Sequence, residues 1–237
     1  MAGNQQGRSC IEAVVFDLDG VLIDSEQLWD QVRRGLAEEN ALPWPVEATT
    51  AMQGMSTPEW AHYLTGTVGV PGSDPEVAAT VIERMAALYE RELPLLPGAV
   101  EVVTRLGEHW PLGLASSSPR LLIDTVLNAS GLTGHFAVTV STEEVAAGKP
   151  SPAVYQAVAQ RMGVAPARTV AIEDSSNGLR SAAAAGLIVL AVPDKTFPPA
   201  PGALALATAQ ADRLTDVTPE FIESLCPEND DKSNRTE

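Results

Sequence analysis

The chain has 237 residues, of which 45% are hydrophobic and 19% are charged, so it is long enough for a full α/β core with a smaller inserted unit. Its 31 acidic residues against 15 basic ones give a formal net charge of -16. This charge disfavours nucleic acids and anionic membranes as partners, because both are bound by clustered Lys and Arg.

The amino-terminal residues 1–9 are polar and lack the apolar segment of a signal peptide. The longest apolar run, residues 182–192, is interrupted by Gly186 and is much shorter than the roughly 20 residues that a membrane span needs. Cys10 and Cys226 lie near opposite ends without metal-ligand spacing, so we expect no disulfide framework. These features predict a soluble, cytoplasmic protein.

The first predicted strand, residues 11–16, ends in an acidic loop in which Asp17 and Asp19 are followed by Gly20. A short apolar run is typical of a buried parallel strand, and in open α/β sheets the ligand crevice lies beyond the carboxyl ends of the strands. A simple turn would also explain Asp and Gly at this place. A calcium loop is excluded, because apolar residues 21–23 stand where further oxygen ligands would be required.

The pattern then changes to helices. Apolar residues recur at four-residue spacing over residues 28–36 and again line one face over residues 76–90. Prolines and glycines punctuate the chain between these two faces. Since no convincing strand lies in this block, we predict a helical domain over residues 25–93, inserted into a core formed by residues 1–24 and 94–226.

Strands and helices alternate through the rest of the core. Strands are predicted at residues 112–115, 136–140, 169–172 and 187–192, and helices at residues 99–108, 119–131, 152–163 and 177–185. Strands that alternate with helices of about ten residues are typical of a doubly wound parallel sheet, so the predicted fold class is α/β. The charged, polar residues 227–237 are interpreted as a disordered tail.

Three serines follow the predicted strand at residues 112–115. Hydroxyl groups and free amides at the start of a helix are typical of an anion site, although they can also serve only as helix caps. Ser118, which stands before Pro119, is interpreted as such an N-cap. That role leaves Ser116 and Ser117 unexplained by capping and favours them as anion ligands.

Two later loops carry charged residues. Lys149 is one of three lysines in the chain, and a solvated surface charge is the simplest interpretation, although its loop is also compatible with a phosphate or carboxylate partner. Glu173 and Asp174 follow the strand at residues 169–172, and Asp174 could merely cap the next helix. Two acid-tipped strands in one parallel sheet would, however, bring like charges together, which is costly unless a cation neutralises them.

Carboxylate oxygens suit Mg²⁺, which commonly takes one or two carboxylates together with a substrate phosphate oxygen and several waters. Acidic residues, an anion loop and a lysine at one sheet edge therefore point to phosphoryl transfer. A carboxylate can act as the nucleophile in such a reaction, with positioning and charge neutralisation supplying most of the catalysis.

Together, the motifs described above resemble those of a known family, the haloacid dehalogenase superfamily, and the resemblance spans nearly the whole chain. The resemblance rests on four motifs in order: Asp17-Leu18-Asp19-Gly20, Ser116, Lys149-Pro150, and Glu173-Asp174 with Ser175 and Gly178. It implies a Rossmann-like core, an all-helical cap inserted after the first strand, and an Mg²⁺ cofactor.

The resemblance also implies a role for each motif residue. Asp17 would be the nucleophile that becomes an aspartyl phosphate, and Asp19 would protonate the leaving group and then activate water. Ser116 and the Ser117 amide would hold the phosphoryl oxygens, while Lys149 would neutralise Asp17 and the phosphate. The implied Mg²⁺ ligands are the Asp17 carboxylate, the Asp19 main-chain carbonyl, Asp174 and, directly or through water, Glu173.

Within the superfamily, Asp19 argues against the dehalogenases, and a segment 25–93 without lysine argues against the phosphonate-cleaving branch. The nearest alternative is a β-phosphoglucomutase-like phosphosugar mutase. That enzyme has a histidine where this chain has Trp29, and a Gly-x-Ser-Arg segment where this chain has residues 54–57 with threonine last. Residues 24–30 instead resemble phosphatases of hexose and hexitol phosphates.

We therefore expect an Mg²⁺-dependent phosphatase acting on a small phosphorylated metabolite, a sugar or polyol phosphate. The mutase is the alternative, and a non-catalytic binding module is a third hypothesis. Trp29, Gly54 and Ser56 are candidate substrate-binding residues of the cap, although packing explains Trp29 equally well. No nucleic acid or membrane partner is expected, and the chain is predicted to be a monomer or weak dimer.

Overall fold

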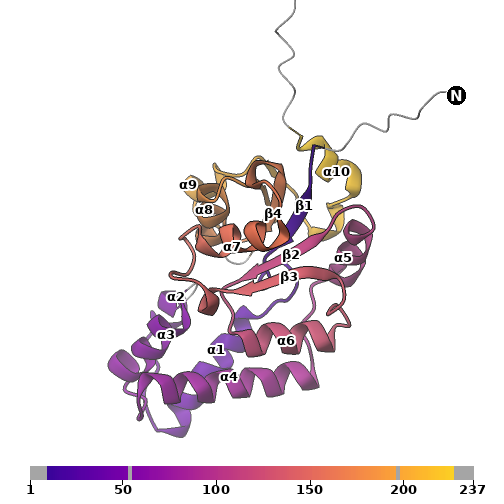
Figure 1. Cartoon of the computed structure of the whole chain (residues 1–237). Coiled ribbons are helices and arrows are strands. Elements are labelled where there is room, and N and C mark those ends of the chain that lie inside the picture. Colours follow the sequence, from indigo (N-terminus) through magenta and orange to yellow (C-terminus); the bar gives the residue numbers. More distant parts are fainter. Residues whose placement is uncertain (1–9, 53–54, 196–197, 227–237) are drawn as a thin grey trace, which may run out of the picture.

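The structure is a computed structural model that describes residues 10–52, 55–195 and 198–226 (Figure 1). Its centre is a six-stranded sheet in the order β3-β2-β1-β4-β5-β6, in which every neighbouring pair is parallel. The predicted doubly wound α/β core is confirmed. The strands are β1 (Ala13–Phe16), β2 (Leu112–Ser116), β3 (Phe136–Ser141), β4 (Thr169–Glu173), β5 (Ile188–Ala191) and β6 (Ala209–Gln210).

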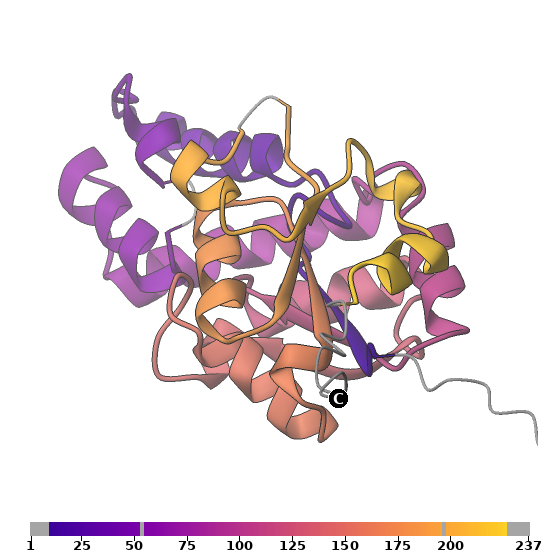
Figure 2. The ribbon, with the colours of Figure 1, turned by 90° about the horizontal axis from the view of Figure 1, so that it is seen from above.

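The sheet is buried on both faces because its strands are apolar at successive positions. In β1, Val14 and Phe16 belong to one hydrophobic cluster, whereas Val15 belongs to the other, as the alternation of a strand requires. Figure 2 shows α8 (Ser176–Ala184, orange) and α10 (Pro219–Ser224, yellow) on opposite sides of the sheet. The first cluster includes residues of α5 (Ala99–Gly107), α6 (Arg120–Ala129) and α10 (Pro219–Ser224), and the second includes residues of α7 (Ala153–Met162), α8 (Ser176–Ala184) and α9 (Pro201–Leu204).

Among the described residues between β1 and α5 there are four α-helices, as the sequence predicts for this segment, and Figure 1 shows them gathered beyond one edge of the core. Helices α3 (Thr57–Tyr63) and α4 (Asp74–Arg91) each begin with a capping box and a proline in the first turn, which stabilises their amino-terminal ends. Helix α4 packs against α6, so the inserted helices share the first hydrophobic cluster with the core. The helices are α1 (Glu26–Glu39), α2 (Ala48–Met52), α3 (Thr57–Tyr63) and α4 (Asp74–Arg91), with a π-helical turn at Leu64–Val68.

The chain leaves the core and returns to it through two adjacent segments. Ile23 forms an antiparallel bridge with Leu95, and the amide of Asp24 donates a hydrogen bond of 2.8 Å to the carbonyl of Pro94. The insertion is therefore attached to the core through two connections that support each other.

The predicted capping role of Ser118 is wrong. Helix α6 has Pro119 at its N-cap and no side-chain cap, because the Ser118 hydroxyl donates instead to the carboxylate of Asp19. Proline supplies the backbone angle that starts the helix without a capping hydroxyl. Ser118 is therefore available to the acidic loop after β1.

The expectation of no disulfide is also wrong, since Cys10 and Cys226 are bonded and their Cα atoms lie 5.8 Å apart. Cys10 precedes β1, whereas Cys226 follows α10, a short helix that the sequence analysis did not predict. The linear spacing of the cysteines gave no sign that this helix returns to the start of the chain. In the part of the chain that the structure describes, the helices are too short or too polar to cross a lipid bilayer.

Breaking the bond between Cys10 and Cys226 is expected to destabilise the protein, because the crosslink closes a loop with a sequence separation of 216 residues in the unfolded chain. Disulfides typically contribute about 2–4 kcal/mol to stability, and a loop this long lies at or above the upper end of that range. Dithiothreitol should therefore lower the thermal unfolding midpoint by several degrees. The variant Cys226→Ser should unfold at the lower temperature with or without the reductant, and equal midpoints for oxidised and reduced wild type would contradict the expectation.

Candidate active site

Two neighbouring strands bring three carboxylates together at the carboxyl edge of the sheet. Phe16 of β1 pairs with Ile172 of β4, and the amide of Asp17 extends this ladder with a hydrogen bond of 3.0 Å to the carbonyl of Ile172. Because the two strands are parallel, the residues that follow them meet at the same edge of the sheet. One carboxylate oxygen from each of Asp17, Glu173 and Asp174 lies within 4.8 Å of the others.

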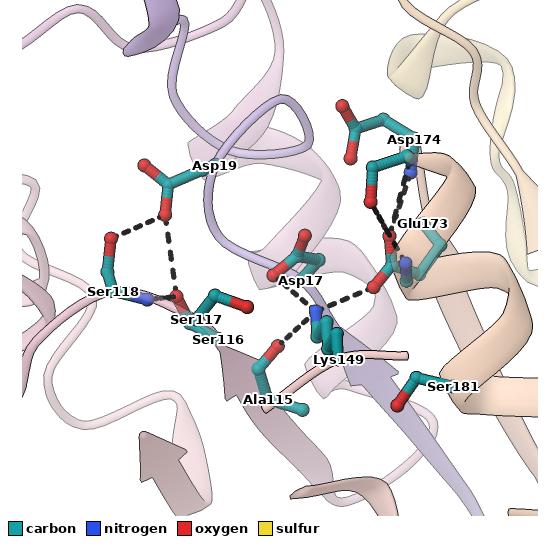
Figure 3. Close-up of polar contacts among 12 residues, drawn as sticks. Asp17, Asp19, Ala115, Ser116, Ser117, Ser118, Lys149, Glu173, Asp174 and Ser181 are labelled. Atoms are coloured by element: carbon teal, nitrogen blue, oxygen red, sulfur yellow. Dashed lines mark hydrogen bonds and ion pairs between the residues drawn. The ribbon is translucent and has the colours of Figure 1, made fainter. Parts of the chain in front are cut away.

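A single ammonium group lies among these acids (Figure 3). Lys149 Nζ is 2.9 Å from Asp17 Oδ1 and 2.6 Å from Glu173 Oε1, and it donates a third hydrogen bond of 3.0 Å to the carbonyl of Ala115. The three protons of the ammonium therefore have three acceptors. Burial opposes the charge, but Asp17 and Glu173 outweigh it and raise the pKa of Lys149, which stays protonated at neutral pH.

Glu173 is fully buried, and both of its oxygens are already engaged. Besides the lysine, Oε1 accepts a hydrogen bond of 2.6 Å from the Tyr155 hydroxyl, while Oε2 accepts from the amide of Asp174 at 3.2 Å and from the Ser175 hydroxyl at 3.3 Å. A Cβ atom at residue 178 would lie 1.9 Å from Oε2, so only glycine lets α8 pass this carboxylate. Glu173 thus holds the lysine and the loop after β4, and it has little capacity left for a metal.

The other two acids retain unused oxygen capacity. Burial and the nearby Glu173 raise the pKa of Asp17 to about 8, against the lowering effect of Lys149. The pKa of Asp174 is also raised by burial and by Glu173, and its Oδ1 atom is buried with no hydrogen-bond partner among the described residues. A divalent cation would supply the positive charge and the ligand contact that these groups lack. The donor set therefore fits a hard cation such as Mg²⁺, with Asp17 and Asp174 as side-chain ligands.

The loop after β1 is shaped to admit Asp174. Gly20 has a φ of +80°, and a Cβ at this position would lie 2.0 Å from Asp174 Oδ2. Its amide donates a hydrogen bond of 2.7 Å to the carbonyl of Ile23, which closes the loop tightly. Both the left-handed backbone and the close approach require glycine here.

Asp19 points away from the lysine and is held by serines from two loops (Figure 3). Ser118 donates to its Oδ2 atom at 2.6 Å, Ser25 donates to Oδ1 at 2.5 Å, and Ser116 lies 3.4 Å from Oδ2. Neither Ser25 nor Ser118 is predicted as a site residue from the sequence. Ser116 is fully buried beneath the cavity, whereas Ser117 and Ser118 line it.

A cavity of about 540 Å³ connects this acidic edge to the inserted helices, a size that suits a small metabolite. Trp29 lines it, as its prediction as a substrate-binding residue requires, and so do Trp60 and Arg33. Ser56 does not line it, and its hydroxyl instead donates to Glu59 in the capping box of α3. The predicted Gly54 lies outside the described residues.

Comparison with known proteins gives a consistent result. Residues 11–186 match the haloacid dehalogenase-like hydrolase family. The chain is 35% identical over 219 residues to hexitol phosphatase B of Escherichia coli (strain K12), covering 88% of this chain and 95% of that protein. It is 30% identical to the phosphorylated carbohydrates phosphatase of Thermotoga maritima, covering 75% and 82%. The crystal structure of CbbY from Rhodobacter sphaeroides in complex with phosphate superimposes with a TM-score of 0.77 at 26% identity, covering 87% and 96%.

Removing the carboxylate at position 174 is expected to weaken Mg²⁺ binding by about 10- to 100-fold, because the ion would lose a side-chain ligand. The variant Asp174→Ala can be compared with wild type by calorimetric titration with MgCl₂. Asp212→Ala removes an exposed acid and should leave the affinity unchanged. Equal affinity in Asp174→Ala and wild type would show that the ion binds elsewhere.

The close approach of α8 to Glu173 predicts that Gly178→Ala destabilises the fold by about 1–3 kcal/mol, since the fully buried carboxylate must shift. A Cβ added at Gly35 in α1 would meet no heavy atom within 4 Å, and Gly35→Ala should raise stability by about 0.5–1 kcal/mol. Urea unfolding of both variants measures the difference. The expectation fails if both substitutions change stability in the same direction.

Proposed function

The chain belongs to the haloacid dehalogenase-like hydrolases, and from the geometry of its site we propose that it is an Mg²⁺-dependent phosphatase of sugar or polyol monophosphates. The observation that carries the proposal is the cluster of Asp17, Lys149 and Asp174 at the end of a cavity that has room for a small metabolite. The names of the hexitol and carbohydrate phosphatases similar to this chain support the substrate class.

We assign the first chemical step to Asp17 as the nucleophile. Its carboxylate oxygen forms a bond to phosphorus while the bond from phosphorus to the ester oxygen breaks, and Asp19 gives a proton to the departing alcohol. Asp17 is then an aspartyl phosphate. The ammonium of Lys149, 2.9 Å from Asp17, reduces the repulsion between the nucleophile and the anionic phosphoryl group.

The second step returns the enzyme to its starting state. Asp19 accepts a proton from water as the water oxygen attacks phosphorus, and the bond from phosphorus to Asp17 breaks to release inorganic phosphate. Ser118 and Ser25 keep the Asp19 carboxylate oriented during both transfers. The amide of Ser117 and the serine loop are assigned to the phosphoryl oxygens.

The metal would be held by the carboxylates of Asp17 and Asp174 and the main-chain carbonyl of Asp19, with Glu173 acting mainly through Lys149. When bound, Mg²⁺ supplies positive charge that keeps Asp17 ionised despite its raised pKa and that offsets charge on the transferring group. The unpaired oxygen of Asp174 supports this assignment.

We also propose that residues 25–93 form a cap domain over a core of residues 1–24 and 94–226. The paired segments at Ile23 and Leu95 are suited to act as the hinge, and closure of the cap would limit water access to the site. The expectations of a monomer or weak dimer and of a cytoplasmic protein stay predictions.

A phosphate-release screen across sugar, polyol, nucleotide and glycolytic acid phosphates tests the function. We expect turnover of sugar or polyol monophosphates with MgCl₂, and loss of turnover with EDTA or in Asp17→Asn. That variant should unfold at or above the wild-type temperature, because it removes a buried like charge.

Conversion of a sugar 1-phosphate to the 6-phosphate faster than phosphate appears would instead favour the mutase. An active Asp17→Asn protein would overturn the assignment of the nucleophile. Absence of turnover on every phosphomonoester would overturn the proposed function itself.

A further inference from the structure

Arg33 is a buried cation in the wall of the cavity, contributed by the inner face of α1. Its side chain is 7% exposed. The guanidinium carbon lies 4.7 Å from the ring centre of Trp29 and 5.0 Å from that of Trp60, whose rings are themselves 5.8 Å apart. Both indoles therefore stabilise the charge and restrict the orientation of the guanidinium.

These ring contacts do not supply hydrogen-bond acceptors to the guanidinium. Its Nε atom is buried and has no partner among the described residues. No carboxylate of those residues lies within ion-pair distance of the guanidinium, in contrast to the neighbouring Arg34, which pairs with Asp30 at 3.0 Å. Buried charges are normally paired, so Arg33 has the donor capacity of a group prepared for a ligand.

The charge itself is retained at neutral pH. Burial lowers the pKa of Arg33 to about 10, partly against the effect of the acidic Glu26. Glu26 lies two helical turns earlier on α1 and lines the same cavity, where burial raises its pKa. Helix α1 therefore contributes both a hydrogen-bond donor, the guanidinium of Arg33, and an acceptor, the carboxylate of Glu26, to the lining of the cavity.

The electrostatic surroundings indicate the kind of ligand. Besides Glu26, the acidic residues Asp24 and Asp194 line the cavity, and both help to raise the pKa of Glu26, so acidic groups surround its carboxylate. A second phosphate or a carboxylate would be repelled by them. Hydroxyl groups both donate and accept, and they can satisfy a guanidinium and a carboxylate together without added charge.

We propose that Arg33 is a specificity-determining residue that donates hydrogen bonds to the hydroxyl oxygens of an uncharged polyol tail, with Glu26 accepting from the same tail. The inference rests on the proposed function, since the phosphate of that substrate is the group bound at Asp17. A substrate without hydroxyl groups would leave the buried guanidinium unpaired, and sites that reserve buried donors for a substrate reject analogues that cannot accept from them.

The test compares a substrate that has the tail with one that lacks it. Sorbitol 6-phosphate and n-propyl phosphate can be assayed by phosphate release in Arg33→Met, which keeps an unbranched side chain of similar length without charge. We expect kcat/KM for sorbitol 6-phosphate to fall by about 10- to 100-fold, the effect of losing charge-assisted hydrogen bonds. The value for n-propyl phosphate should stay within about threefold of wild type. The matched control Arg34→Met, which removes the half-buried charge that pairs with Asp30 one residue away, should change neither value.

A second variant keeps the inference testable where Arg33→Met fails to fold. Arg33→Lys retains the charge between the two indoles but has no planar fork, so the preference for sorbitol 6-phosphate over n-propyl phosphate should fall by several-fold. An unchanged preference in a folded Arg33 variant, or an equal loss on both substrates, would overturn the proposal. So would a wild-type preference for sorbitol 1,6-bisphosphate that disappears in Arg33→Met, because it would assign the cation to a second phosphate.

The same data separate this inference from the proposed function. If the wild type hydrolyses neither monophosphate nor any other phosphomonoester, the proposed function fails. If the wild type hydrolyses both and the substitution of Arg33 leaves their ratio unchanged, only the role of Arg33 fails.

Discussion

Three carboxylates share one ammonium group at the carboxyl edge of the sheet, and this imbalance of charge determines much of the surrounding structure. Lys149 compensates Asp17 and Glu173 directly, but Asp174 keeps a buried oxygen without a partner among the described residues. Burial and mutual repulsion raise the pKa of both Asp17 and Asp174, so the folded chain ionises them at a cost that either a bound proton or a further cation relieves. The cluster is therefore suited to hold a cation.

The order of the strands makes this cluster unavoidable. Within the sheet, β2 is the neighbour of β1 on one side and β4 is its neighbour on the other side. The crevice between the loops that follow β1 and β4 is therefore open to a ligand. Parallel register places Asp17 next to the end of β4. Glycine at residue 20 admits Asp174, and glycine at residue 178 admits Glu173, so both acids approach backbone that any side chain would block. Topology brings the acids together, and the two glycines set how closely they can approach.

Much of this arrangement could be predicted because it depends on local patterns. Apolar strands that end in acids or serines mark the carboxyl edge of a parallel sheet, and that rule locates Asp17 and Glu173 without coordinates. It does not locate Lys149, which stands eight residues after the end of β3 and whose side chain is buried, so its simplest interpretation as a solvated surface charge is wrong. Contacts between distant segments left no such pattern. The pairing of Cys10 with Cys226 depends on the return of α10 to the start of the chain, and the interaction of Ser118 with Asp19 depends on the exact angle at which α6 begins. A serine before a proline, such as Ser118, has the same sequence pattern whether its hydroxyl caps a helix or binds a side chain of the site.

The inserted helices contain a cavity residue that was not predicted from the sequence. They also supply the groups to which we assign substrate selectivity. Arg33 lies four residues after Trp29 on the buried stripe of α1, and a charged residue at that spacing is the signal that the sequence analysis overlooked. Core loops supply the groups that any phosphate ester needs, whereas α1 supplies a stacked cation and an acid that address the rest of the ligand. Chemistry and selectivity thus come from different segments of the chain, which meet at the paired connections of Ile23 and Leu95 and where α4 packs against α6. Substitutions on α1 can therefore change the preferred substrate while the acidic edge, and the reaction it performs, stays the same.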